Sequence, residues 1–309
     1  MRTVFFGTPA IAVPALKALA ETTELVGVVS QPDRPAGRGL SLKAPPVKEA
    51  AESLGIEVHQ PVKVKTGSLH EWIAGRHADA VIVMAYGRIL PRPVLEAPRK
   101  GCLNLHASVL PKLRGAAPIN WAVIRGERQT GISLMHMDEG MDTGPVYAIR
   151  TLDILPEETA GELACRLSEL ARQVVIGDLP AALRGDLAAV AQDDSRATLA
   201  PPITDAHWWI DWHRPTTEIC NLVRGLAPRP GARTVLEGKC LRILALVPSP
   251  LVSDVPMGTI TIGGAYQPIV RTIDGAVEVA KAQVEGRRVC CGTDLVHGRL
   301  LRAGGVLGR

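Results

Sequence analysis

An asparagine and a histidine stand two positions apart in the stretch GCLNLHASVLPKLRGAAPINWAV, near the end of an apolar run. Because side chains two positions apart project from the same face of a β-strand, Asn104 and His106 point the same way. A carboxamide can donate a hydrogen bond to a developing oxyanion, and an imidazole can move a proton. A strand end with two satisfied polar side chains is the alternative. The Ser, Pro and Arg-Gly that follow at once favour a functional loop.

A second group of polar residues lies further along the chain, in the stretch MDEGMDTGPVY. Asp138, Glu139 and Asp142 alternate with glycines there, but the spacing of an EF-hand calcium loop is absent. A solvated turn is one interpretation. In the other, one carboxylate folds back over the end of the strand that carries Asn104 and His106. An amide, an imidazole and a carboxylate around one pocket suit acyl transfer to an amine.

The N-terminal stretch TVFFGTPAIAVPAL has the order strand, turn and helix, which is also the order of a dinucleotide site. The glycine fingerprint of such sites is missing, since Gly7 stands alone and Pro9 occupies the place of a second glycine. We therefore expect no nicotinamide dinucleotide. The turn still presents backbone amides at a helix start, where a polar substrate group can bind.

The elements that must position these groups alternate between strands and helices. This alternation predicts an α/β fold whose sheet is mainly parallel and Rossmann-like, with covered faces. A long amphipathic helix is predicted over residues 159–184, where leucines and valines recur at helical spacing. The predicted strands of this part are 3–6, 24–30, 56–61, 79–86, 102–107, 131–137 and 146–154.

The amino-acid composition changes after residue 184. Residues 185–205 are poor in large apolar groups and are interpreted as a linker. Several brief strands follow, which predict a smaller domain built as an OB-like β-barrel. We therefore expect a catalytic domain over 1–184, the linker over 185–205 and the β-barrel domain over 206–309.

Composition limits the class of protein. Hydrophobic residues make up 46% of the 309 positions, which is enough for real cores. No apolar run reaches the roughly 18–20 residues that span a bilayer, and the N-terminus lacks a signal-peptide layout. The six cysteines show neither a CxxC pair nor Cys/His ligand spacing. We expect a cytoplasmic protein without a membrane partner, a disulfide framework or a metal ion.

Positive charge is concentrated in two places. From His207 onward, Lys and Arg outnumber Asp and Glu by 13 to 8, whereas the preceding residues are close to neutral. The polar loop 31–48 carries four basic residues against Asp33, and its prolines and glycines predict no regular structure. A solvated surface explains such charge about as well as a polyanionic partner does.

The stretch from Asn104 to Tyr147 closely resembles the core of the formyltetrahydrofolate-dependent formyltransferases. The pattern of that family is N-x-H-x-S-L-L-P-x-x-R-G, followed by D-x-G. The matching residues are Asn104, His106, Ser108-Val109-Leu110-Pro111, Arg114-Gly115 and Asp142-Thr143-Gly144. Val109 stands where Leu is usual, which should leave the folate pocket slightly roomier.

The resemblance implies residue roles and a co-substrate. Asn104, His106 and Asp142 would be the catalytic residues of a formyl transfer from 10-formyltetrahydrofolate. The folate would lie against Ser108, Val109, Leu110 and Pro111.

Two further features resemble the members of the family that formylate the α-amino group of methionyl-initiator tRNA. They are the opening FFGTPAIAVPAL and the loop QPDRPAGRG, which resembles the insertion that enters the acceptor stem. Arg34, Arg38 and Lys43 would then contact the tRNA, with Arg38 foremost. The C-terminal β domain, absent from the smaller phosphoribosylglycinamide formyltransferases, would bind RNA as well.

Three other functions stay open at this point. A sugar-amine formyltransferase would share the Asn/His/Asp core but would not need the basic loop. A formyltetrahydrofolate hydrolase would use water as acceptor and leave the basic C-terminal domain without a role. A non-catalytic RNA-binding module would need none of the three site residues. We expect a monomer, since no long amphipathic surface stripe calls for a partner.

Overall fold

The computed structural model describes residues 1–36, 41–65 and 68–308, and they form two compact units. The first unit comprises Met1–Pro118, Thr130–Leu152 and Ala164–Pro201, and the second comprises Ile119–Gln129, Asp153–Leu163 and Pro202–Arg309. Most of the expected linker therefore groups with the first unit, and two earlier segments group with the second. The division into a catalytic and an RNA-binding domain at residues 184 and 206 stays a prediction.

The first unit is built on a seven-stranded sheet of order β5-β2-β1-β6-β7-β8-β9. The pairs β1 with β2, β1 with β6, β2 with β5 and β6 with β7 are parallel, whereas β7 and β8 are antiparallel. The prediction of a mainly parallel sheet is confirmed. The strands are β1 (Arg2–Gly7), β2 (Glu24–Val29), β5 (Val58–His59), β6 (Ala80–Met84), β7 (Cys102–His106), β8 (Gln129–His136) and β9 (Val146–Asp153).

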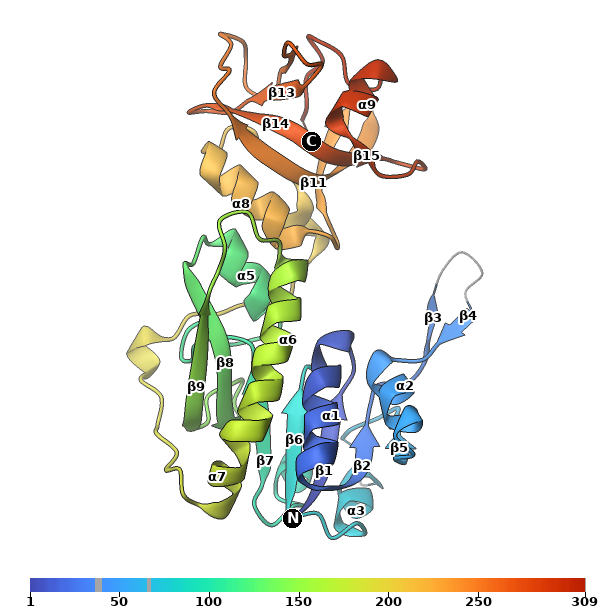
Figure 1. Cartoon of the computed structure of the whole chain (residues 1–309), viewed down its shortest axis with the longest axis vertical. Coiled ribbons are helices and arrows are strands. Elements are labelled where there is room, and N and C mark those ends of the chain that lie inside the picture. The colour runs from blue at the N-terminus through green and yellow to red at the C-terminus, as the bar shows by residue number, and fades with distance from the viewer. Residues whose placement is uncertain (37–40, 66–67, 309) are drawn as a thin grey trace. The chain divides into compact units, whose positions relative to one another are not determined.

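Both faces of this sheet are covered, which explains why β6 is buried along its whole length. Apolar residues of α3 (Ser68–Ala74) and α4 (Arg92–Leu95) pack in one cluster with Val4, Phe6, Val81 and Val83 of the strands. Figure 1 shows α1 (Val13–Thr22) and α6 (Ala160–Gly177) side by side over the opposite face.

The other helical elements of the described residues are short. They are η1 (Ala10–Ala12), α2 (Pro46–Ser53), α5 (Pro118–Ile124), α7 (Leu179–Arg184), η2 (Asp194–Arg196), η3 (Asp205–Trp208), α8 (Thr216–Leu226) and α9 (Gly292–His297).

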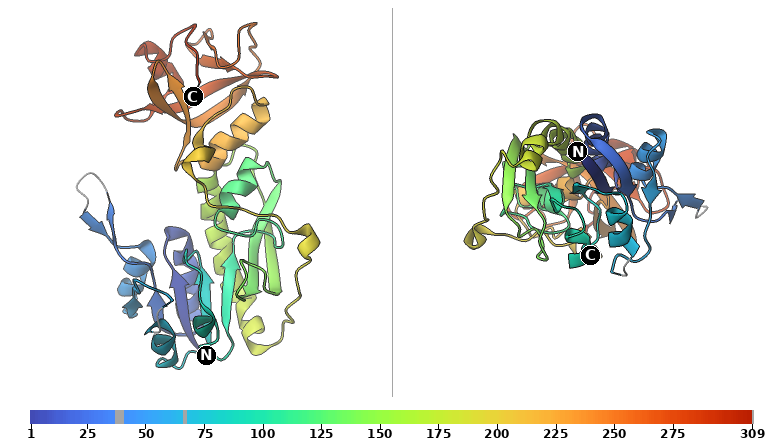
Figure 2. Two further views of the ribbon diagram at one scale, coloured as in Figure 1. Left: turned by 180° about the vertical axis from the view of Figure 1, so that it is seen from behind. Right: turned by 90° about the horizontal axis from the view of Figure 1, so that it is seen from below.

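A largely irregular segment, which includes the short η2, follows α7 and runs along the open edge of the sheet beside β9, as Figure 2 shows from behind. The backbones of Val190 and Val146 exchange two hydrogen bonds, of 2.8 and 2.9 Å. Further on, Arg114 N donates to Thr198 O at 2.8 Å and Ala200 N donates to Arg114 O at 2.7 Å. We call residues 190–200 the strap, because they pair with the start of β9 at one end and with the loop after β7 at the other.

The prediction that residues 31–48 lack regular structure is wrong. Strands β3 (Arg34–Ala36) and β4 (Ser41–Lys43) form a short antiparallel hairpin. Proline is tolerated in such a two-stranded ribbon because a strand with a free edge does not need every backbone donor. The register places Arg34 directly opposite Lys43. Arg38 lies outside the described residues.

The second unit is an antiparallel sheet of order β10-β11-β14-β13-β12, with β15 added to β14. Gly308 exchanges backbone hydrogen bonds with Val235 of β10, and Gly304 and Gly305 bond to Ile260 of β12. The last residues thus join the two outer strands, so the sheet closes into the expected small barrel. The strands are β10 (Ala232–Leu236), β11 (Lys239–Ser249), β12 (Ile260–Ile262), β13 (Pro268–Arg271), β14 (Ala276–Val284) and β15 (Cys290–Cys291).

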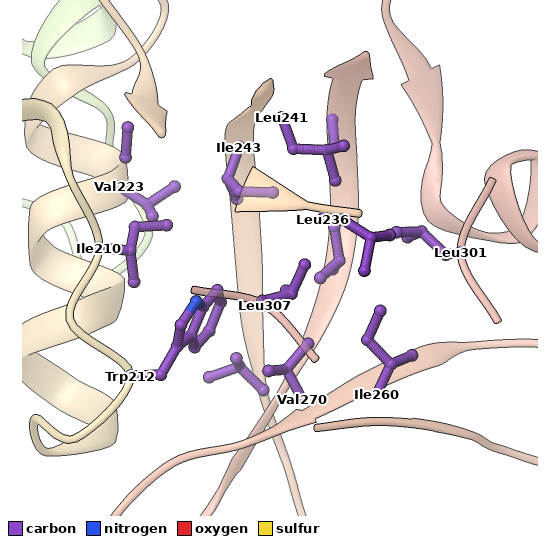
Figure 3. Packing of buried hydrophobic residues seen from close by; sticks show 14 of the residues in the cluster. Ile210, Trp212, Val223, Leu236, Leu241, Ile243, Ile260, Val270, Leu301 and Leu307 are labelled. Atoms are coloured by element: carbon purple, nitrogen blue, oxygen red, sulfur yellow. The ribbon is translucent and has the colours of Figure 1, made fainter. Parts of the chain in front are cut away.

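An apolar core fills the barrel and contacts α8. Figure 3 shows Leu307, from the closing segment, at the centre of this core with Trp212, Leu236 and Ile260 around it. Trp212 donates a hydrogen bond from its indole nitrogen to Thr234 Oγ1 at 3.0 Å, so its one polar group is satisfied inside the core. Among the described residues, no helix is long and apolar enough to cross a membrane.

Replacing Leu307 by alanine should lower the free energy of unfolding by about 2–5 kcal/mol, because it removes a central side chain of the barrel core. The adjacent Val306 is the matched control: its side chain is 57% exposed, against 3% for Leu307. Val306→Ala should change stability by less than about 0.5 kcal/mol. Urea denaturation followed by tryptophan fluorescence measures both variants. Equal destabilisation by the two would contradict a closing role for Leu307.

Candidate active site

Strand β7 brings Asn104 and His106 to its carboxyl end on one face of the sheet. In open α/β sheets, ligands bind outside the carboxyl ends of the strands, so the position suits a site. His106 is only 5% exposed, and its Nε2 lies 2.9 Å from the carbonyl oxygen of Leu113. A carbonyl only accepts hydrogen bonds, so Nε2 carries a proton. Nδ1 is then the ring atom that faces the site.

Asp142 reaches this strand end from the loop between β8 and β9. Its Oδ2 lies 3.5 Å from His106 Nδ1, and its Oδ1 accepts a hydrogen bond from Asn104 Nδ2 at 3.4 Å. The Gly115 amide donates to Oδ2 at 2.8 Å. The structure therefore brings together the three residues that the sequence singles out.

The loops around Asp142 are shaped by glycines that cannot carry a side chain. A Cβ on Gly144 would lie 2.0 Å from the carbonyl oxygen of His136, at the end of β8. A Cβ on Gly115 would lie 2.7 Å from the carbonyl oxygen of Ala200, and Gly115 has a φ of +123°. Asp142 itself has a φ of +56°, a conformation that is uncommon for a residue other than glycine. Its contacts therefore hold a strained backbone in place.

The turn over Ser108, Val109, Leu110 and Pro111 lies beside this site and is tied to β8. Ser133 Oγ donates to Ser108 O at 2.7 Å and accepts from Leu110 N at 3.1 Å. Ser108 and Leu110 are buried, whereas Val109 and Pro111 are partly exposed. Only the latter two offer side-chain surface to a ligand, and the folate-binding role of all four stays a prediction.

The basic hairpin is anchored at its base by a polar cluster. Lys48 Nζ lies 2.9 Å from Asp33 Oδ2, and Gln60 Nε2 donates to Asp33 Oδ1 at 2.7 Å. These bonds, first from Gln60 and then from Lys48, hold the pKa of Asp33 below its ordinary value, so its carboxylate is charged at neutral pH. Arg34 and Lys43 lie beyond this anchor and are exposed. Their binding to tRNA stays a prediction.

Sequence reasoning missed two groups of residues at the site. Ser133 looks like an ordinary small residue of an apolar strand, and only its pairing with His106 across β7 and β8 reveals its position. Gln192 and Asp194 lie in the segment interpreted as a linker, yet both contact Arg114. The only sequence signal for these two residues was Arg114, because a guanidinium requires hydrogen-bond acceptors wherever it becomes buried.

Among the described residues, no group of three or more His, Cys, Asp or Glu side chains is arranged to hold a metal ion.

Replacing Gly144 by alanine should destabilise the first unit by about 1–3 kcal/mol, because the new methyl group cannot fit against the backbone of His136. Gly264→Ala is the control, since a Cβ at Gly264 meets no atom within 4 Å. Urea denaturation compares the two. Unchanged stability of Gly144→Ala would show that the Asp142 loop can shift without cost.

Comparison with known proteins supplies the family. The family model described as formyl transferase matches residues 1–179, and the one described as formyl transferase, C-terminal domain, matches residues 202–300. A methionyl-tRNA formyltransferase of Sorangium cellulosum is 53% identical over 311 residues, covering 100% of both chains. One from Desulfotalea psychrophila is 42% identical, covering 93% of this chain and 90% of its own.

A solved structure shows the same fold at much lower identity. It is an N-formyltransferase from Helicobacter canadensis in complex with folinic acid and dTDP-3-aminofucose. The two chains are 15% identical with a TM-score of 0.67, over 90% of this chain and 98% of the other. At that identity the likeness concerns the fold alone. The two family matches and the full-length relatives together show that the chain belongs to the methionyl-tRNA formyltransferase family of formyl transferases.

Proposed function

We propose that this chain transfers the formyl group of 10-formyltetrahydrofolate to the α-amino group of methionyl-initiator tRNA. The products are N-formylmethionyl-tRNA for translation initiation and tetrahydrofolate. The observation that carries the proposal is the convergence of Asn104, His106 and Asp142 in a chain whose relatives of that name align over its full length.

The chemistry requires a neutral amine as nucleophile. An α-amino group has a pKa near 7.7–8.0, so only roughly a tenth of it is neutral at pH 7. The amine nitrogen bonds to the formyl carbon, the bond from that carbon to the folate nitrogen breaks, and the amine proton must leave. Asp142 is the acceptor for this proton, directly or through water, and the folate nitrogen receives a proton as it departs.

Negative charge develops on the formyl oxygen during the attack. Asn104 Nδ2 is a donor for that oxygen, because its bond to Asp142 is long at 3.4 Å and can be exchanged for a better one. His106 presents Nδ1, since Nε2 is engaged by Leu113. A donor to the formyl oxygen at Nδ1 would require a proton on that nitrogen as well as on Nε2.

The nucleic acid would contact the hairpin and the second unit. Arg34 and Lys43 are opposite each other, so two cations project from one short ribbon, and Arg38 lies between them in sequence. On the second unit, a hollow is lined by Arg287 and Arg288, both exposed. Phosphate groups bind such clusters mainly through charge. The positive balance of the C-terminal third supports the same partner.

The basic hairpin weighs against a sugar-amine substrate, because a small acceptor needs no cation-bearing ribbon anchored by Asp33 and Gln60. Hydrolysis of the folate would leave the charge of the second unit unused, and a binding module would not need the three clustered site residues. We further propose that the enzyme acts in the cytoplasm as a monomer.

A discriminating assay incubates the enzyme with 10-formyltetrahydrofolate and one acceptor at a time: methionyl-initiator tRNA, a dTDP-aminosugar, or water alone. We expect formyl transfer to the tRNA only. Faster transfer to the aminosugar, or tetrahydrofolate release without an acceptor, would refute the proposal.

In the same assay, Asn104→Ala should lower kcat by about 10²–10³, the usual cost of one lost oxyanion donor. Folding should be retained, because Asn104 is partly exposed. Circular dichroism checks the fold. A fully active variant would remove Asn104 from the mechanism.

Replacing both Arg34 and Lys43 by alanine should raise KM for the tRNA about tenfold and leave KM for the folate unchanged. Each lost phosphate contact should also make the dependence of log KM on log salt shallower by about 1. Lys17→Ala, which removes one exposed cation from α1, is the control for losing positive charge outside the hairpin. If all three changes affect both substrates alike, the hairpin has no special role in tRNA binding.

A further inference from the structure

The strap lies against both loops that build the site. At one end Val190 pairs with Val146, which follows the Asp142 loop, and at the other Ala200 pairs with Arg114 in the loop after β7. Backbone pairing at both ends fixes the path of the strap. The side chains between these ends are therefore held opposite the two loops.

Gln192 is the strap residue that contacts both loops. Its Nε2 donates to the carbonyl oxygen of Asp142 at 2.8 Å and to that of Gly144 at 2.7 Å. Its Oε1 accepts from Arg114 Nε at 3.1 Å and Nη2 at 2.8 Å. Every hydrogen-bonding group of the Gln192 amide is thus directed at backbone or side chains of the two loops.

Arg114 makes this contact rigid. Its side chain is only 7% exposed, and Nη2 also pairs with Asp194 Oδ1 at 2.7 Å. A buried guanidinium is costly unless its donors are satisfied, so Arg114 holds Gln192 in one orientation. Asp194 is 82% exposed, so its ion pair with Arg114 is largely screened by solvent. Gln192 is therefore the stronger constraint of the two.

The two carbonyls that Gln192 holds belong to Asp142 itself and to Gly144, and they flank Thr143. Asp142 has a left-handed backbone, which persists only where its surroundings hold it. The position of the carboxylate depends on that backbone. We propose that Gln192 is a positioning residue for the reaction: it fixes the Asp142 loop so that the carboxylate stays beside Asn104 and His106.

The kinetic part of this inference rests on the proposed function, and Gln192→Glu tests it. Glutamate keeps the length of the side chain and an acceptor for Arg114, but it removes both donors to the loop carbonyls. We expect kcat for formyl transfer to fall between tenfold and a hundredfold, since a small displacement of a catalytic group has effects of that size. KM for the folate and for the tRNA should stay within about twofold of wild type.

Asp194→Asn is the matched control. It weakens the other contact of Arg114, retains an acceptor oxygen and leaves the Asp142 loop untouched, so kcat should stay within about twofold. Gln192→Met, similar in length and without polar atoms, replaces Gln192→Glu if thermal unfolding shows that the glutamate variant does not fold. Equal kcat values for the Gln192 variant and the wild type would overturn the inference, as would a rise in both KM values at unchanged kcat.

A second readout does not depend on the substrate. Hydrogen exchange of backbone amides between residues 138 and 146 should quicken in Gln192→Glu and not in Asp194→Asn. Unchanged exchange in the Gln192 variant would overturn the inference even if formylation is confirmed. Conversely, quickened exchange in an enzyme that fails to formylate methionyl-tRNA would refute the proposed function and leave the positioning role standing.

Discussion

The carboxylate of Asp142 joins segments that are far apart in the sequence, and the rest of the site depends on it. The carboxylate contacts Asn104 and His106 of β7 and the amide of Gly115 in the loop that follows. The backbone carbonyl of Asp142 accepts a hydrogen bond from Gln192 of the strap. A carboxylate so close to an imidazole and a carboxamide needs a backbone that resists displacement. The paired strands of the sheet hold Asn104 and His106 in place. The loop after β7 and the strap hold Asp142 through hydrogen bonds.

Much of the fold could be predicted from the sequence because strands and helices have periodic signatures. The apolar runs of the sheet and the brief strands of the barrel all appear close to their expected positions. The matching family pattern indicated Asn104, His106 and Asp142, but the sequence could not show that they meet. Their meeting depends on Gly144 and Gly115, which lie against the backbone of His136 and of the distant Ala200.

Other features could not be predicted, for identifiable physical reasons. The strap is poor in apolar residues, and backbone hydrogen bonds are available to nearly any residue, so its pairing leaves no signature. The hairpin could not be predicted because a proline such as Pro35 usually argues against a strand. A two-stranded ribbon with a free edge nevertheless tolerates a proline. The contacts of Arg114 with Gln192 span a separation of 78 residues. Local patterns carry no information about such a distance.

The second unit collects residues from three parts of the chain. Within it, Asn120 Nδ2 donates to Gly225 O at 2.8 Å, and Gly161 N donates to Ala227 O at 3.2 Å. Chimeras between relatives joined at a single point near residue 202 would therefore pair a barrel with foreign copies of residues 119–129 and 153–163. Exchanging the barrel intact means transplanting those two short segments as well, so recombination within this family is constrained at three places.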